Sequence, residues 1–153
     1  MRVWRICNAI WAATAFDGQG ASAYGGRWNS VGTSVVYTSS SLALAALESL
    51  VHLGVKSIPK PQVAIPADIP EGLIIDQVEP DNLPSNWKDD PPPAALAAIG
   101  DQWVSTGKSS VLKVPSAVIT EEWNYLLNRE HLDFTQIVIG TARPFQFDSR
   151  LFQ

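Results

Sequence analysis

The β-rich runs of this sequence are short, and only two stretches have the composition of a long helix. Residues 42–53 and 94–106 are built mainly from Ala, Leu and other good helix formers. Residues 3–7 and 34–38 are typical of single strands, and the shortness of such runs argues against regular winding of strands and helices into a parallel sheet. The pattern predicts an α+β fold of short mixed or antiparallel strands with a few helices.

The remaining segments are assigned by the same signals. Further strands are expected at residues 62–66, 73–75, 111–114, 135–139 and 144–147. Serines 39–41 offer hydroxyls to begin the first helix, and Gly54 and Gly107 are expected to end the two helices. Loops are expected at 17–29 and at the Pro- and Asp-rich stretch 80–93, which should be exposed and carries Trp87, and a short helix or turn at 121–128.

Size and charge limit the classes of protein that fit. The 153 residues suit one domain, 1–153, and the contents of 46% hydrophobic and 17% charged residues indicate a globular chain. A net charge of −4 argues against a general nucleic-acid binder. The single Cys7 excludes an internal disulfide and a multi-cysteine zinc site, so no metal is expected. No apolar run reaches membrane-spanning length and no cleavage signal is seen, which predicts a cytoplasmic protein.

One segment contains the residue types that can bind an anionic nucleotide and act on its sugar. Two glycines precede Arg27 and Trp28, Tyr37 follows ten residues after Arg27, and Glu48 follows eleven after Tyr37. An Arg fork matches phosphate oxygens, aromatic rings stack on flat bases, and a carboxylate can stabilise a cationic sugar. Trp28 is the tryptophan expected to face a ligand. The alternative is a surface turn in which the Arg27 stem lies on Trp28.

Glu48 is unusual because it lies on a largely apolar stripe of the expected helix 42–53. A buried carboxylate is costly unless it has a partner or a function. The alternative is a carboxylate at the helix rim, paired with His52 four residues on.

Three further side chains have both a structural and a functional interpretation. Arg5 interrupts an apolar strand and points either to solvent or into a cleft. Tyr37 ends a β-rich run, where half-buried core rings are common. Ser116 follows a strand end without a nucleophile elbow, so it is either a turn serine or a hydroxyl that binds a ligand.

An ordered set of motifs along nearly the whole chain resembles the RES-domain toxins, a family named after an Arg, a Glu and a Ser. Arg27, Glu48 and Ser116 stand at those positions. The motifs that carry the resemblance are Gly25-Gly26-Arg27-Trp28-Asn29, Val35-Val36-Tyr37, Leu47-Glu48-Ser49-Leu50-Val51-His52, Val114-Pro115-Ser116-Ala117-Val118-Ile119, Asn124-Tyr125-Leu126-Leu127-Asn128 and Phe147-Asp148-Ser149-Arg150-Leu151. Thr120 and Arg129 depart from prolines that are frequent in the family.

The resemblance implies a fold similar to the diphtheria-toxin-type ADP-ribosyltransferases. It implies the toxin of a bacterial toxin–antitoxin system, with NAD⁺ as substrate and depletion of cellular NAD⁺ as the outcome. It also implies a cognate Xre-type antitoxin with a helix-turn-helix domain that blocks the active site, so that DNA is contacted only through the antitoxin. A homodimer within that complex is compatible with the resemblance.

The resemblance also assigns roles to residues. Arg27, Tyr37 and Glu48 would carry the catalysis, while Arg5, Trp28, Ser116 and Asn124 would bind NAD⁺. The bond between nicotinamide and ribose would break, with transfer to water (a glycohydrolase), to phosphate (a phosphorylase) or to a protein (an ADP-ribosyltransferase). The alternative from another class is a non-catalytic module that binds a partner in an aromatic groove.

Overall fold

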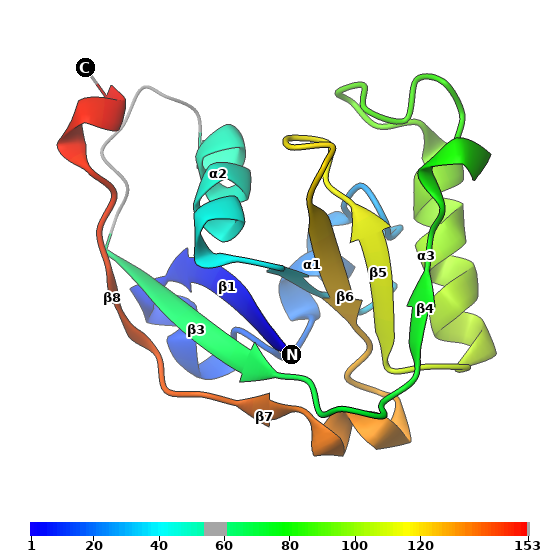
Figure 1. Cartoon of the computed structure of the whole chain (residues 1–153), viewed down its shortest axis with the longest axis horizontal. Helices are drawn as coiled ribbons and strands as arrows, with labels where there is room; N and C mark the ends of the chain where they lie inside the picture. Colours follow the sequence, from blue (N-terminus) through cyan, green and yellow to red (C-terminus); the bar gives the residue numbers. More distant parts are fainter. Residues whose placement is uncertain (54–60, 153) are drawn as a thin grey trace.

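The computed structural model describes residues 1–53 and 61–152. Gly54, expected to end a helix, lies outside these residues. Eight strands of the described chain form one curled sheet (Figure 1). They are β1 (Arg2–Asn8), β2 (Val36–Ser39), β3 (Gln62–Asp68), β4 (Ile75–Gln77), β5 (Val111–Pro115), β6 (Trp123–Leu127), β7 (Val138–Ile139) and β8 (Arg143–Phe145).

The sheet is mixed and joins two halves through β2. The strand order is β4-β5-β6-β2-β1-β3-β7, and β8 also pairs with β3. Among the described strands, β4 and β5 run parallel and the other pairs are antiparallel. β1 pairs with β2 at a single position, Trp4 opposite Ser39, whereas it pairs with β3 along its whole length. Beyond that position β1 and β2 separate, and Figure 1 shows the two halves of the sheet on either side. The expected α+β class with mixed short strands is confirmed.

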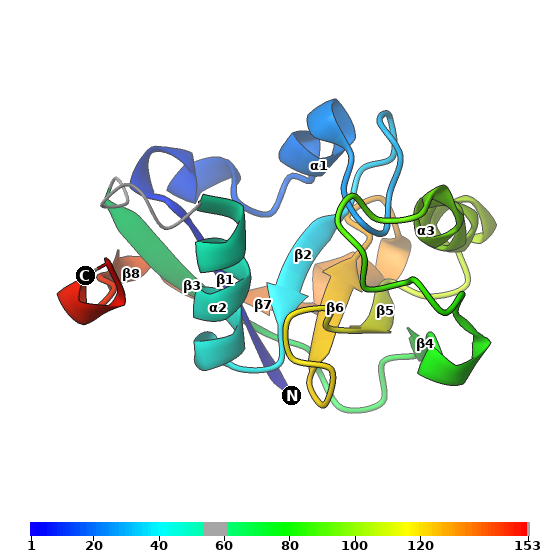
Figure 2. The same ribbon diagram turned by 90° about the horizontal axis from the view of Figure 1, so that it is seen from above.

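Two long helices and several short ones surround the sheet (Figure 2). The long helices have the predicted bounds. In the described chain the helices are α1 (Gln19–Tyr24), α2 (Leu42–Leu53), α3 (Ala94–Thr106) and the 3₁₀ helices η1 (Ala9–Thr14), η2 (Pro80–Asn82), η3 (Leu132–Gln136) and η4 (Ser149–Phe152). Ser41 Oγ accepts a hydrogen bond from Leu44 N at 3.1 Å at the start of α2, and Gly107 ends α3 with a φ of 56°.

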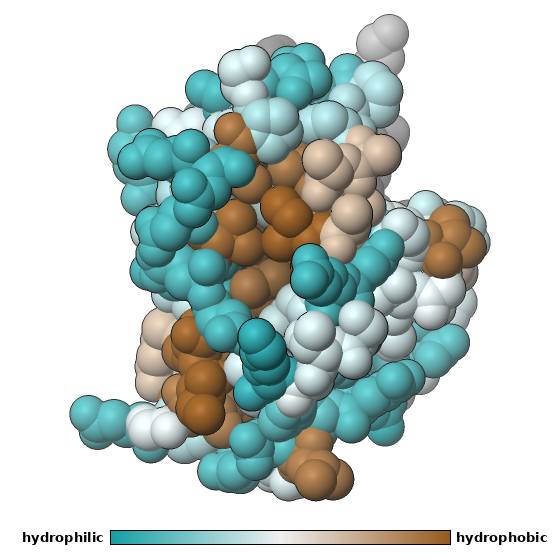
Figure 3. All heavy atoms as spheres, turned by 90° about the vertical axis from the view of Figure 1, so that its right-hand side faces the viewer, coloured by the Kyte–Doolittle hydropathy of each residue, from teal (hydrophilic) through white to brown (hydrophobic). Residues whose placement is uncertain are grey.

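Two apolar cores pack against the sheet, and β5 and β6 contribute side chains to both. One cluster gathers Val3, Val36, Ile65 and Leu127 with Phe16. The other packs α3 against β5 and β6 and includes three tryptophans, Trp28, Trp87 and Trp103, with Leu96 and Leu126. Viewed from the side of α3 and β4, apolar side chains gather at the centre of the surface with hydrophilic side chains around them (Figure 3).

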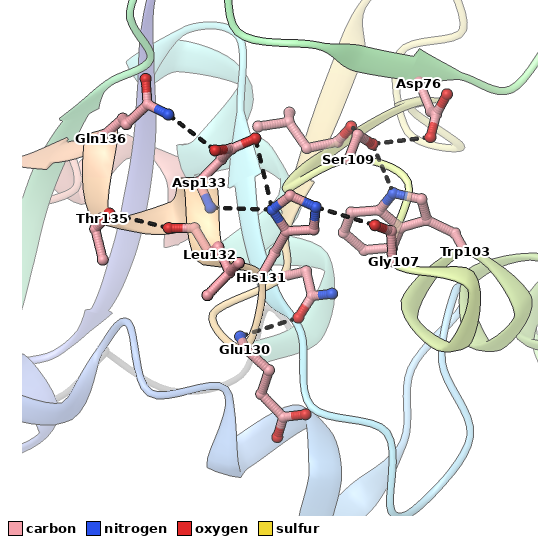
Figure 4. Close-up of polar contacts among 12 residues, drawn as sticks. Asp76, Trp103, Gly107, Ser109, Glu130, His131, Leu132, Asp133, Thr135 and Gln136 are labelled. Carbon is pink, nitrogen blue, oxygen red and sulfur yellow. Dashed lines mark hydrogen bonds and ion pairs between the residues drawn. The ribbon is translucent and has the colours of Figure 1, made fainter.

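A polar network fastens the end of α3 to the sheet (Figure 4). Trp103 Nε1 donates to Ser109 Oγ at 2.9 Å, and Ser109 Oγ donates to Asp76 Oδ2 at 2.8 Å. His131 Nε2 lies 3.1 Å from the carbonyl oxygen of Gly107. These contacts join the C-terminal end of α3 to β4 and to the start of η3, close to where β5 begins.

The structure corrects several expectations. The strand expected at 135–139 is reduced to β7, because residues 132–136 form η3, and the strand expected at 73–75 is β4 at Ile75–Gln77. Residues 17–29 contain the short helix α1, although their Gly, Ser and Ala content resembles a loop. Residues 123–127 form strand β6, because β2 and β5 flank them and offer backbone partners on both sides. The stretch 80–93 contains η2, and its Trp87 is 9% exposed because the ring packs into the core beside α3.

Candidate functional site

The site is built around the carboxylate of Glu48, which projects from the middle of α2 and is half-buried. Its Oε1 accepts a hydrogen bond from Ser116 Oγ at 2.7 Å and another from Asn124 Nδ2 at 2.6 Å. Ser116 follows β5 directly and Asn124 lies in β6. Three segments that are distant in sequence therefore meet at one carboxylate oxygen, and the interpretation of Glu48 as a rim residue does not describe this arrangement.

The other oxygen of Glu48 has different surroundings. Within residues 1–53 and 61–152, no group donates a hydrogen bond to Oε2. One oxygen is thus held by the protein, and the second remains available to a ligand. A carboxylate fixed in this way has little freedom to turn, which suits a group that must face a particular atom of a substrate.

Ser116 supports the carboxylate from a buried position. The residue is fully buried, and its Oγ accepts from Val118 N at 3.1 Å and Ile119 N at 3.0 Å while donating to Glu48. Both acceptor positions and the single proton of the hydroxyl are therefore occupied. This geometry favours orientation of Glu48 over direct contact of Ser116 with a ligand.

The hydroxyl of Tyr37 is engaged within the protein, so the part of this side chain that can contact a ligand is its ring. The hydroxyl donates to Asn29 Oδ1 at 2.7 Å and accepts from Trp28 N at 3.0 Å. Burial raises the pKa of Tyr37 well above its usual range, so the phenol stays protonated. A Cβ on Gly26 would lie only 2.6 Å from this hydroxyl, which explains the glycine at that position.

Arg5 points into the separation between β1 and β2 and not to solvent. Its Nη1 donates to Tyr37 O at 2.9 Å, while its Nε is buried and has no hydrogen-bond partner among residues 1–53 and 61–152. Burial lowers the pKa of the Arg5 guanidinium. A buried donor without a partner is costly, so the group is suited to receive an acceptor from a ligand.

Both terminal nitrogens of the Arg27 guanidinium donate to backbone carbonyl oxygens. Nη1 donates to Trp87 O at 2.6 Å, and Nη2 donates to Asp89 O at 3.1 Å. These bonds fix the guanidinium and anchor the segment between η2 and α3. Because carbonyl oxygens carry no formal charge, the Arg27 cation is positioned without being neutralised by these partners.

A cavity of about 1050 Å³ brings these side chains to one surface. Arg5, Arg27, Tyr37, Glu48 and Asn124 all line it, and its volume suits a ligand of nucleotide size. A second cavity of about 160 Å³ lies against several of the same residues, including Arg5, Glu48 and Asn124.

Trp28 differs from the other candidates. It borders the large cavity, but it is 2% exposed and its ring belongs to the core cluster beside α3. The structure therefore gives its ring almost no surface for a ligand, and its backbone N–H serves Tyr37 instead.

Two residues of the site had no role in the sequence interpretation. Asn29 is buried, and its Nδ2 donates to the carbonyl oxygens of Ala21, Ser30 and Thr33 while its Oδ1 receives Tyr37. Ser39 Oγ donates to Asn124 Oδ1 at 2.7 Å. Asn29 lies inside the motif Gly25-Gly26-Arg27-Trp28-Asn29 that carries the family resemblance, so the sequence did point to it. Ser39, in contrast, is expected from the sequence only to offer a hydroxyl at the start of a helix.

The described residues give no cluster for a metal and no membrane-crossing helix. Across residues 1–53 and 61–152, His, Cys, Asp and Glu side chains form no group of three that could hold a metal ion. In the same residues, no helix has the length and apolar character needed to cross a bilayer.

Comparison with known proteins gives full-length matches. The RES domain family matches residues 2–148. The chain is 34% identical to the "Prs ADP-ribosylating toxin" of Sphingobium sp. (strain YBL2), over 98% of this chain and 96% of that protein. It is 37% identical to "Toxin Res" of Yersinia enterocolitica serotype O:8 / biotype 1B, over 99% of both chains.

A solved structure has the same fold. A chain of the toxin–antitoxin complex MbcT–MbcA of M. tuberculosis aligns with a TM-score of 0.74 at 15% identity, over 95% of this chain and 84% of that one. At this identity the likeness establishes the fold alone.

Proposed function

Because the chain belongs to the RES-domain family, we propose that it is the toxin of a toxin–antitoxin pair and that it breaks the nicotinamide–ribose bond of NAD⁺. The observation that carries this proposal is the asymmetric Glu48 carboxylate. One oxygen is held by Ser116 and Asn124, and the other accepts no hydrogen bond from the described residues. The carboxylate lines a cavity that two arginines and Tyr37 also line.

Cleavage of the nicotinamide–ribose bond requires a fixed carboxylate of this kind. When the glycosidic bond breaks, nicotinamide leaves with the bonding electrons as a neutral molecule, and the ribose carbon becomes oxocarbenium-like. A fixed negative charge near that carbon stabilises the transition state more than the ground state. In our proposal Glu48 Oε2 supplies this charge and accepts a hydrogen bond from a ribose hydroxyl.

The other groups would hold the rest of NAD⁺. Arg5 and Arg27 are the cations that we assign to the pyrophosphate, since guanidinium groups match phosphate oxygens. The Tyr37 ring would stack on the nicotinamide, because its hydroxyl is already engaged within the protein. Asn124 would act beside Glu48 at the ribose. We do not assign a ligand contact to the Trp28 ring.

The acceptor of the ADP-ribosyl group defines three versions of the reaction. Water would give a glycohydrolase, phosphate a phosphorylase, and a protein side chain an ADP-ribosyltransferase. The transferase version has support in a relative that is named an ADP-ribosylating toxin. All three begin with the same bond cleavage, so the proposed roles of Glu48 and the arginines are shared.

A partner is part of the proposal. The structural neighbour comes from a toxin–antitoxin complex. We propose that a cognate Xre-type antitoxin, with a helix-turn-helix domain, covers the large cavity and silences the toxin, and that the pair acts in the cytoplasm, where NAD⁺ is available.

The experiment is product analysis. The purified chain is incubated with NAD⁺ alone, with added phosphate, and with bacterial protein extract, and the products are identified by mass spectrometry. Free nicotinamide with ADP-ribose, with ADP-ribose phosphate, or with modified protein identifies the acceptor. Intact NAD⁺ under all three conditions would exclude the enzyme and favour a non-catalytic partner-binding module.

A further inference from the structure

We propose that Ser39 is a positioning residue for the NAD⁺-cleaving site, holding the carbonyl end of the Asn124 amide so that the amino end faces Glu48. This inference rests on the function proposed above. Ser39 Oγ donates to Asn124 Oδ1 at 2.7 Å, and Asn124 Nδ2 donates to Glu48 Oε1 at 2.6 Å. The three side chains form one directed chain of hydrogen bonds.

The backbone fixes Ser39 unusually well. It is the last residue of β2, opposite Asn124 of β6 on one side and opposite Trp4 of β1 on the other. It is also the only position at which β1 and β2 pair along their described lengths. With 5% of its surface exposed, its side chain has few other places to lie. The hydroxyl is therefore presented to Asn124 by paired strands on both sides.

The amide needs this support because its two ends are chemically different. Turned around, the amide would put its oxygen against the Glu48 carboxylate, and two acceptors repel each other. Without the Ser39 hydroxyl, no described residue donates to Asn124 Oδ1. The amide oxygen would then seek another donor, and its rotation would loosen the bond to Glu48.

The experiment compares Ser39→Ala, Ser39→Thr and a control in the full chain. Ser39→Ala should lower kcat for NAD⁺ cleavage about tenfold, as expected for losing support of a charged hydrogen bond, with KM changed less than about twofold. Ser39→Thr keeps the hydroxyl and suits a strand, so it should restore the rate.

Ser109→Ala is the matched control. Ser109 is a buried serine whose hydroxyl also donates to a carboxylate, that of Asp76 (Figure 4). It precedes β5, whereas Ser116 follows the other end of that strand. This variant should lose thermal stability while keeping kcat. An equal loss of kcat in both alanine variants would mean that the effect of Ser39 is only structural.

A double-mutant cycle tests the route of action. In an Asn124→Ala background, Ser39→Ala should change kcat by less than about twofold, because the residue through which it acts is gone. A further tenfold loss in that background would overturn the inference.

An NMR measurement keeps the inference testable without turnover. Solvent exchange of the Asn124 side-chain amide protons should be about tenfold faster in Ser39→Ala than in wild type, and slow again in Ser39→Thr. If wild type cleaves no NAD⁺, the proposed function fails, while unchanged amide exchange in Ser39→Ala would sink the positioning role by itself.

Discussion

The two oxygens of the Glu48 carboxylate are used differently, one for attachment and one for chemistry. Oε1 receives Ser116 and Asn124, and the hydroxyl of Ser116 is in turn held by two backbone N–H groups. Such supporting contacts keep a charged group in place without filling its reactive side. The same division appears at Tyr37, whose hydroxyl serves the protein and whose ring borders the cavity.

Arg27→Lys should weaken NAD⁺ binding without abolishing it. Lysine keeps the charge but cannot reach two carbonyl oxygens with one rigid fork, so the cation would be less well placed. We expect an affinity between those of wild type and Arg27→Ala, measured by calorimetry. Equal affinities for the three proteins would remove Arg27 from the site.

Tyr37→Phe should cost stability more than binding. The change leaves Trp28 N and Asn29 Oδ1 without their shared partner, and the loss should be about 1–3 kcal/mol in chemical denaturation. The phenyl ring can still stack, so NAD⁺ affinity should stay within about threefold of wild type. Tyr37→Leu is the comparison in which affinity should fall. A large loss of affinity in Tyr37→Phe would show that the hydroxyl itself contacts the ligand.

At the level of elements, α3 holds the segment that carries Arg27. Gly100 lies where a Cβ would be 1.8 Å from the carbonyl oxygen of Trp28, and Asp101 Oδ1 accepts from Ser30 N at 2.9 Å. Burial raises the pKa of Asp101, but hydrogen bonds from Ser30 and Thr33 lower it by more, so the net shift is downward. The contact with Ser30 should therefore weaken only in acid, as the carboxyl is protonated.

Gly100→Ala should push α3 away from the Arg27 segment. Because the clash is with backbone, the helix or the segment must shift, at a cost of about 1–3 kcal/mol. Thermal unfolding measures the loss. Gly20→Ala is the matched control, since Gly20 lies in α1 with no atom near the added Cβ, and it should be neutral or stabilising. Equal stability of the two variants would contradict the close approach.

Local patterns in the sequence predicted some elements well and others poorly. The two long helices were predicted because the effect of Ala and Leu composition is local, and so is that of Gly107, which ends α3. β6 was missed because its strand state depends on β2 and β5, which lie far away in sequence. Trp87 was placed in an exposed loop because Pro and Asp dominate its surroundings, and its burial depends on α3 and β5.

The site was predictable to a similar degree. Glu48 stood out as a carboxylate on an apolar helix face, which is a local signal. The pairing of Glu48 with Ser116 and Asn124 joins residues separated by 68 and 76 positions, and spacing alone cannot indicate it. The likeness to a family pointed to Ser116 and Asn124, but as groups that bind NAD⁺ and not as partners of Glu48. Ser39 had no such signal, because three adjacent serines all resemble helix caps.

On the scale of the whole molecule, the site lies where the two halves of the sheet part. β1 and β2 pair only at Trp4 and Ser39, and Arg5, the next residue of β1, turns its guanidinium into the separation. If β1 and β2 paired continuously at this point, their backbone groups would hydrogen-bond to each other and would not be available to a side chain such as that of Arg5. The separation leaves a cavity that members of both apolar cores line, Ala15 from one and Val35 from the other, and the exposed ring of Trp11 lies at its border.

A bound antitoxin should silence the protein by occupying this cavity. Exposed Trp11, Tyr24 and Val51 line it and offer apolar surface to a covering segment. The purified complex with the cognate antitoxin should cleave no NAD⁺, and deleting the covering segment of the antitoxin should restore cleavage. Full activity of the intact complex would mean that the antitoxin acts elsewhere.

The most direct measurement is nicotinamide release from NAD⁺ by wild type and Glu48→Gln. Glutamine keeps the size of the side chain and can still bind Ser116 and Asn124, but it removes the negative charge. The rate should fall about a hundredfold or more, while circular dichroism and thermal unfolding remain close to wild type. Release at a near wild-type rate from the folded variant would contradict the role of Glu48 and with it the proposed mechanism.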